Sequence, residues 1–140
     1  MVGTQILASG GNAFDAAIAV AAAEGVLLPM MCGLGGDAFV VLHDATRNET
    51  LAYNGSGVAA AGATRAFFAD AGHDTMPLQG VHSVAVPGAL GVYEAIHQRH
   101  GSRPWDALWA PAIDLAENGL AVNQYVAQWL TQERERLARY

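Results

Sequence analysis

The chain has 140 residues, of which 52% are hydrophobic and only 14% charged, and its formal net charge is −6. All seven basic residues are arginines and they form no basic stripe, which excludes a typical nucleic-acid partner. The single cysteine, Cys32, excludes an intrachain disulfide, and the most apolar stretch, residues 13–31, is interrupted by Asp15 and Glu24 and predicts no membrane span.

The first firmly predicted element is a helix over residues 13–27. Two glycines precede Asn12 and can end a short earlier helix. Asn12 has the chemistry of an N-cap, and Asp15 three residues later completes the pattern of a capping box. The helix is apolar nearly all round, which predicts burial on most of its faces, and Pro29 ends it.

A glycine loop and a β-hairpin follow. Residues 32–37 (CGLGGD) have loop composition, whereas residues 38–43 are rich in β-branched and aromatic side chains and predict a strand. Residues 50–54 predict the second strand of a hairpin, which Gly55-Ser56-Gly57 ends. A short helix is expected near residues 63–68.

The middle of the chain predicts one more strand and a helix. Residues 82–86 (HSVAV) have the composition of a buried strand. They lead into a helix over residues 87–99, whose first residue is a proline. We expect this helix to direct Leu90, Tyr93 and Ile96 towards a core.

Prolines and asparagines mark the last elements. Pro104 opens a short helix, and Pro111 is expected to break it, because an interior proline removes a backbone donor and clashes with the preceding turn. A further turn or two is expected over residues 112–117. Asn123 then caps a helix that reaches Tyr140 without a stop signal, which suggests a truncated chain.

The order of helices, hairpin, strand and further helices predicts an α/β (α+β) layered fold, in which residues 1–140 form a single partial domain. Helices this apolar need cover from additional chain.

The glycine loop does not have the chemistry of a nucleotide site. A P-loop requires a lysine and a serine or threonine after its last glycine, and the chain has no lysine. Asp37, directly after the glycines, would repel a phosphate. Two alternatives remain: close backbone packing, or a loop whose N–H groups approach an acyl group or an oxyanion.

Few polar side chains stand out as site residues. His97 and His100 lie three apart near a helix end, where the helix dipole favours them, so we predict neither a metal site nor a cofactor. Cys32 lies in an apolar context that favours a structural role. Ser56 is better placed to present a hydroxyl to a pocket, although Gly-Ser-Gly is also ordinary loop composition. The remaining histidines are individually uninformative: His43, His73 and His82.

Five blocks occur in order across nearly the whole chain. They are residues 10–17 (GGNAFDAA), Pro29 followed by 33–39 (GLGGDAF), 83–88 (SVAVPG), Trp105, and 111–116 (PAIDLA) followed by Gly119. Each block alone is weak, but together, in this register, they resemble the γ-glutamyltransferase (γ-glutamyltranspeptidase) family of N-terminal-nucleophile hydrolases.

The resemblance implies a four-layer αββα fold and a precursor that cleaves itself to free an N-terminal threonine on a small subunit. The threonine hydroxyl attacks an amide or γ-glutamyl carbonyl, with its own α-amine as base. Residues 1–140 correspond to the early part of the large subunit, so we expect no catalytic residue among them. The implied partners are a small-molecule amide substrate, the remainder of the large subunit and the small catalytic subunit.

One departure from the family pattern concerns the substrate. Family members follow the second strand with an arginine that pairs with the substrate's α-carboxylate, and here that position is Ser56. A hydroxyl cannot supply the charge and the bidentate geometry of a guanidinium. We therefore predict that Ser56 is a substrate-binding residue. Residues 54–57 (NGSG), together with Gly36 and Asp37, more closely resemble the acylase and amidohydrolase branch of the family. Arg65 is near in sequence, but nothing in the sequence places it in the same pocket.

The expected function is amide hydrolysis or acyl transfer on a small molecule, as part of a longer precursor. The alternative is a non-catalytic remnant that acts as a structural or assembly module. Met1 to Leu7 carries no positive side chain, so the expected compartment is the cytoplasm, or the periplasm or exterior if the true N-terminus lies upstream.

Overall fold

The structure is a computed structural model that describes residues 1–139. The chain divides into two compact units, one made of Met1–Gly33 together with the chain from Gly101 onward, the other of Leu34–His100. Each unit is described by itself.

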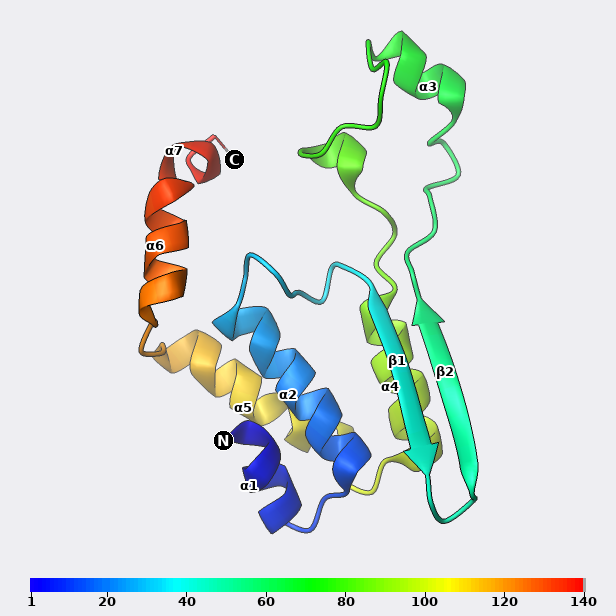
Figure 1. The fold of residues 1–140 in the computed structure, drawn as a ribbon, viewed down its shortest axis with the longest axis vertical. Coiled ribbons are helices and arrows are strands. Elements are labelled where there is room, and N and C mark those ends of the chain that lie inside the picture. The colour runs from blue at the N-terminus through cyan, green and yellow to red at the C-terminus, as the bar shows by residue number, and fades with distance from the viewer. Residues whose placement is uncertain (140) are drawn as a thin grey trace. The chain divides into compact units, whose positions relative to one another are not determined.

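The first unit is helical (Figure 1). Its helices are α1 (Val2–Ala8), α2 (Ala13–Leu27), α5 (Trp105–Asn118), α6 (Gln124–Gln132) and α7 (Arg134–Leu137). Both α1 and α5 pack against α2.

The predicted capping box begins α2. The Asn12 Oδ1 atom accepts hydrogen bonds from the N–H groups of Phe14 and Asp15, each at 2.9 Å. The Asp15 carboxylate in turn accepts from the Asn12 N–H at 2.9 Å. Three N–H groups at this end therefore have partners, and the helix begins where the sequence predicts it.

Alanine contacts join α2 to α5. Ala22 and Ala23 pack with Ala112, and Trp109 and Leu115 lie against this cluster. Such small side chains let two helices approach closely. Helix α2 is buried or half-buried on most of its faces, as the sequence predicts, and one stripe of the helix stays exposed. The exposed positions are Ala13, Ala17, Val20 and Glu24.

The expected break at Pro111 is wrong. Helix α5 continues through Pro111 to Asn118. Leu108 on one side of the proline is fully buried, and Ala112 on the other side is 6% exposed. Their burial stabilises a continuous helix and offsets the hydrogen bond that the proline cannot donate.

The second unit contains a two-stranded antiparallel sheet and one long helix. Strand β1 (Ala38–Asp44) pairs with β2 (Glu49–Gly55), with Ala38 opposite Gly55 and Asp44 opposite Glu49. This confirms the predicted hairpin and extends its strands by a residue or two. Helix α4 (Ala89–His100) packs on both strands.

Residues 82–86 form no strand, contrary to the prediction. They belong to a short 3-10 turn, η1 (Val81–Ser83), and to an extended segment after it. Val84, Ala85 and Val86 are exposed. The segment makes one backbone hydrogen bond to the chain after β2, from the Val86 N–H to the Val58 carbonyl at 2.9 Å. A β-branched run forms a strand only where a neighbouring strand offers a full ladder.

Helix α4 begins two residues later than predicted. Of the three side chains expected to face a core, Ile96 is buried and Tyr93 is half-buried. Ala89, Val92 and Ile96 are buried, whereas Leu90 is 45% exposed. The helix ends at His100, immediately before Gly101, as the sequence predicts.

The helices α3, α6 and α7 are short. Helix α3 (Arg65–Asp70) is capped by the Thr64 hydroxyl. Asn123 caps α6 as predicted, but α6 ends at Gln132, and α7 is a separate turn. Tyr140, to which we expected this helix to run, lies outside the described residues. Among residues 1–139, no helix combines the length and the hydropathy needed to cross a membrane.

Candidate substrate-binding site

The predicted site residue Ser56 lies just beyond the end of β2. Its side chain is exposed, and its backbone N–H donates to the Asn54 Oδ1 atom at 2.9 Å. This local hydrogen bond closes a turn, which fixes the backbone from which the Ser56 hydroxyl projects.

The residue after Ser56 ties this turn to the glycine loop. The Gly57 N–H donates to the Asp37 carboxylate at 2.8 Å. A Cβ on Gly57 would lie 2.3 Å from the Val86 carbonyl oxygen, so only glycine fits. The Ser56 turn is thus held by one charged acceptor on one side and by backbone packing on the other.

The start of α4 closes against the same turn. The N–H groups of Gly88 and Ala89 donate to the Gly36 carbonyl at 3.2 and 3.0 Å. A Cβ on Gly88 would lie 2.3 Å from the Gly55 carbonyl oxygen. The Gly36 carbonyl therefore joins the end of the glycine loop to the start of α4.

A pocket of about 700 Å³ opens beside this turn. Gly57 lines it, and Ser56 does not. Arg65 lines it as well. Arg65 and Gly57, the residue after Ser56, therefore meet at one pocket, and their spacing in the sequence did not predict this. The other polar lining residues are His73, Asp74, Thr75, His82 and Ser83.

The pocket wall contains two histidines in contact, a pairing that their spacing along the chain does not indicate. His73 Nε2 lies 2.8 Å from His82 Nδ1. The two residues are nine positions apart, and the chain between them forms no strand or long helix from which their contact could be predicted. The nearest hint in the sequence is the pair of adjacent phenylalanines, Phe67 and Phe68, in α3, a helix in which no residue is buried.

His100 and Cys32, the other candidate residues from the sequence, do not line this pocket. His100 is paired with a carboxylate of β1. Its Nδ1 atom lies 2.9 Å from the Asp44 carboxylate, and both side chains are buried. A hydrogen bond from the Thr46 hydroxyl is the main cause that lowers the pKa of Asp44 to about 2, with His100 contributing. Cys32 is half-buried.

Asp44, Glu49 and His100 bring one ligand atom each within 4.8 Å of one another, a geometry that could hold a cation. Two arginines already neutralise these carboxylates. Arg99 donates to Glu49 at 2.8 and 2.9 Å, and Arg47 lies 3.8 Å from Asp44. An ion pair network that joins α4 to the hairpin describes this cluster better than a metal centre.

Comparison with known proteins identifies the family. The family model for gamma-glutamyltranspeptidase matches residues 1–140. A glutathione hydrolase-like YwrD proenzyme of Bacillus subtilis is 38% identical over 86% of this chain and 23% of its own length. The glutathione hydrolase proenzyme of the same species is 34% identical over 99% of this chain and 24% of its own length.

Solved structures agree with this result. A cephalosporin acylase from Bacillus halodurans is 37% identical with a TM-score of 0.91, over 99% of this chain and 26% of that one. The gamma-glutamyltranspeptidase of Helicobacter pylori is 35% identical with a TM-score of 0.90, over 99% and 40%. These matches confirm a helix-rich α/β segment of an N-terminal-nucleophile hydrolase fold. The chain spans about a quarter of the length of the curated relatives it matches. The chain belongs to the gamma-glutamyltranspeptidase family.

Proposed function

We propose that residues 1–140 form the early part of the large subunit of an amide hydrolase or acyltransferase, and that its nucleophile is an N-terminal threonine outside these residues. The observation that carries the proposal is the family match over the whole of residues 1–140. These residues span only about a quarter of the length of the relatives, which leaves room for further chain.

In the proposed reaction, the threonine hydroxyl attacks the substrate's amide carbonyl, and its own α-amine takes the hydroxyl proton. The C–N bond then breaks, and the amine leaves with that proton. Water or a second amine attacks the acyl ester and releases the threonine. Residues 1–140 would bind and orient the acyl group rather than take part in these bond changes.

Ser56 is the residue that we propose contacts the acyl group. Its exposed hydroxyl stands on a turn fixed by Asn54 and Asp37, and preorganised contacts of this kind bind ligands at little entropic cost. In the family pattern that this chain resembles, the same position is an arginine. A neutral hydroxyl does not select a substrate by its α-carboxylate, and likeness to a cephalosporin acylase supports this choice.

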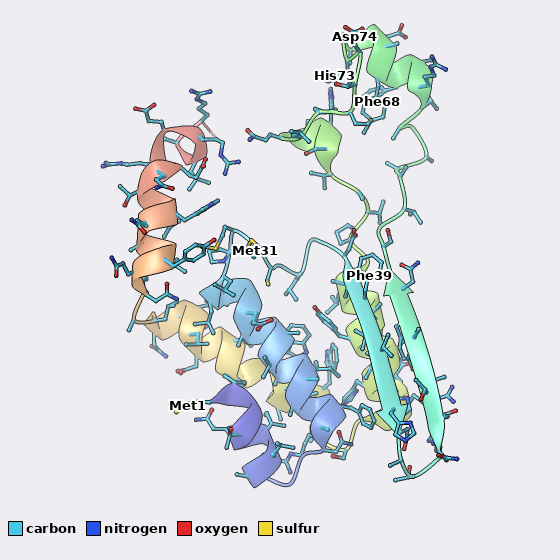
Figure 2. The ribbon with its side chains drawn as sticks, in the orientation of Figure 1. Met1, Met31, Phe39, Phe68, His73 and Asp74 are labelled. Atoms are coloured by element: carbon cyan, nitrogen blue, oxygen red, sulfur yellow. The ribbon has the colours of Figure 1, made fainter. Side chains whose placement is uncertain are left out.

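The outer face of the hairpin supports the proposed partner subunits. Phe39, labelled in Figure 2, is 68% exposed. Val41 is 77% exposed and lies on the same side of β1, because it is two residues further along the strand. Their cross-strand partners are Asn54 and Ala52. Two large apolar side chains on one face of a hairpin fit a second layer of sheet, which we propose comes from the rest of the precursor.

The test is to express the polypeptide in its natural length and to analyse it by mass spectrometry. We expect cleavage into two chains, the smaller one beginning with threonine. Replacement of that threonine by alanine should abolish both cleavage and amide turnover. A protein that stays uncleaved and hydrolyses no amide would support the assembly-module alternative instead.

A further inference from the structure

The pocket beside the Ser56 turn also contains the pair His73 and His82, which the proposed acyl transfer does not use. His73 Nε2 and His82 Nδ1 are 2.8 Å apart, and both side chains are half-buried in the pocket wall. Figure 2 shows His73 beside Phe68 and Asp74, next to α3.

Closed turns hold the backbone on both sides of the pair. The His73 N–H donates to the Phe68 carbonyl at 2.9 Å, directly after α3. His82 lies within η1, where Ser83 donates to the Gly80 carbonyl from its N–H at 3.0 Å and from its hydroxyl at 2.7 Å. The two imidazoles therefore come from separate, locally hydrogen-bonded turns.

Aromatic rings set the orientation of the two imidazoles. Phe67 meets His82 edge-on, with ring centroids 5.3 Å apart. Phe68 lies 6.3 Å from His73 and 6.2 Å from His82. Edge-to-face packing favours defined ring positions and reduces the water that competes for the imidazole nitrogens.

We propose that His73 and His82 are the protein ligands of a late first-row divalent ion, Zn²⁺ or Cu²⁺, bound in this pocket with water in its remaining positions. Imidazole nitrogens suit both ions, and Cu²⁺ binds such donors more tightly than Zn²⁺ does. The charges of Arg65 and Asp74, which line the same pocket, offset each other.

The geometry requires a small change. With Zn–N distances of about 2.0–2.1 Å and tetrahedral angles, two ligand nitrogens lie about 3.3 Å apart. The pair must therefore open by roughly half an ångström from its hydrogen-bonded distance. In the neutral pair, one of the two facing nitrogens holds a proton. When the ion binds, that proton moves to the other nitrogen of the same ring, so both lone pairs reach the metal with no net proton loss.

The first experiment is calorimetric titration of the natural-length polypeptide with ZnCl₂ and, separately, with CuCl₂, in a non-chelating buffer. Both His73→Ala and His82→Ala should weaken binding by roughly tenfold or more, because each removes one ligand. His43→Ala is the matched control, since His43 is an exposed histidine that bonds Thr50 on the hairpin, and it should leave the affinity unchanged. Equal affinities in all variants would overturn the proposal.

A second measurement guards against variants that misfold. Electron paramagnetic resonance of the Cu²⁺-loaded wild-type protein should show hyperfine coupling to two imidazole nitrogens at this site. The conservative variants His73→Gln and His82→Gln should each remove one of those couplings while thermal unfolding of the metal-free protein stays within a few degrees of wild type. Unchanged coupling in both variants would contradict the assignment. Neither readout depends on amide turnover, so the site can fail while the proposed function stands, and the reverse.

Discussion

Asp15 in the first unit and the wall of the pocket in the second are two polar regions built in opposite ways. Asp15 is fully buried and accepts from the N–H groups of Asn12, Ser102 and Arg103 and from the Ser102 hydroxyl. The pocket wall instead presents Arg65, Asp74 and Ser83 with exposed side chains. A carboxylate with its acceptor sites filled holds the fold, whereas accessible donors and acceptors are what a ligand needs.

The largest expected effect is on the free energy of unfolding, when the buried Asp15 is replaced. Burial by itself raises the pKa of Asp15, and the hydrogen bonds from Ser102, Asn12 and Arg103 together outweigh it, so the net pKa is lowered. Asp15→Ala leaves these donors without their acceptor and should cost about 3–5 kcal/mol of unfolding free energy. Urea unfolding of the natural-length protein measures this cost.

The control for this variant is Asp106→Ala. Asp106 is an exposed acidic residue in the first turn of α5, and its loss should change stability by no more than about 0.5–1 kcal/mol. If the two variants are equally stable, the buried carboxylate does not hold the first unit together.

The next effect tests the backbone packing beneath the Ser56 turn. Gly88→Ala would place a methyl group 2.3 Å from the Gly55 carbonyl oxygen, and we expect a loss of about 1–3 kcal/mol. Gly91→Ala is the matched variant within α4, where nothing lies within 4 Å of an added Cβ. It should stabilise the helix by about 0.5–1 kcal/mol. A Gly88→Ala protein as stable as Gly91→Ala would show that the turn tolerates displacement.

A smaller effect concerns pH and the hairpin. The Thr46 hydroxyl, with help from His100, lowers the pKa of Asp44 from 3.8 to about 2. Between these two values the unfolded chain binds more protons, so stability rises with pH there. The contribution is complete above about pH 4 and is lost as pH falls towards 2. Asp44→Asn should remove this part of the pH dependence of the melting temperature, and an unchanged acid slope would contradict it.

Local chemistry in the sequence predicted the elements that short-range contacts decide. Asn12 and Asp15 specify the start of α2, and Asn123 specifies the start of α6, because each capping bond joins residues two or three apart. The hairpin followed from the β-branched run in β1. The family followed from the order of several short blocks rather than from any one of them.

Long-range contacts decided the features that the sequence did not predict. Pro111 stays inside α5 because Leu108 and Ala112 are buried, and residues 82–86 form part of a 3-10 turn and an extended segment without a strand ladder. The meeting of His73 with His82, and of Arg65 with Gly57, depends on how the chain after β2 folds back. Spacing along the chain contains no signal for such contacts.

The most direct test of the central claim compares two substrates of the natural-length enzyme. γ-Glutamyl-p-nitroanilide and 4-aminobutyryl-p-nitroanilide differ only by the α-carboxylate that a guanidinium would bind. With Ser56 in place, we expect kcat/KM values for the two within about tenfold of each other. Ser56→Arg should shift the ratio towards the γ-glutamyl substrate by roughly 10- to 100-fold, the worth of one charge-assisted contact. Ala61→Arg, which adds the same charge at an exposed loop position, should not. A strong preference of the unmodified enzyme for the γ-glutamyl substrate, or equal ratios in all three proteins, would contradict the account.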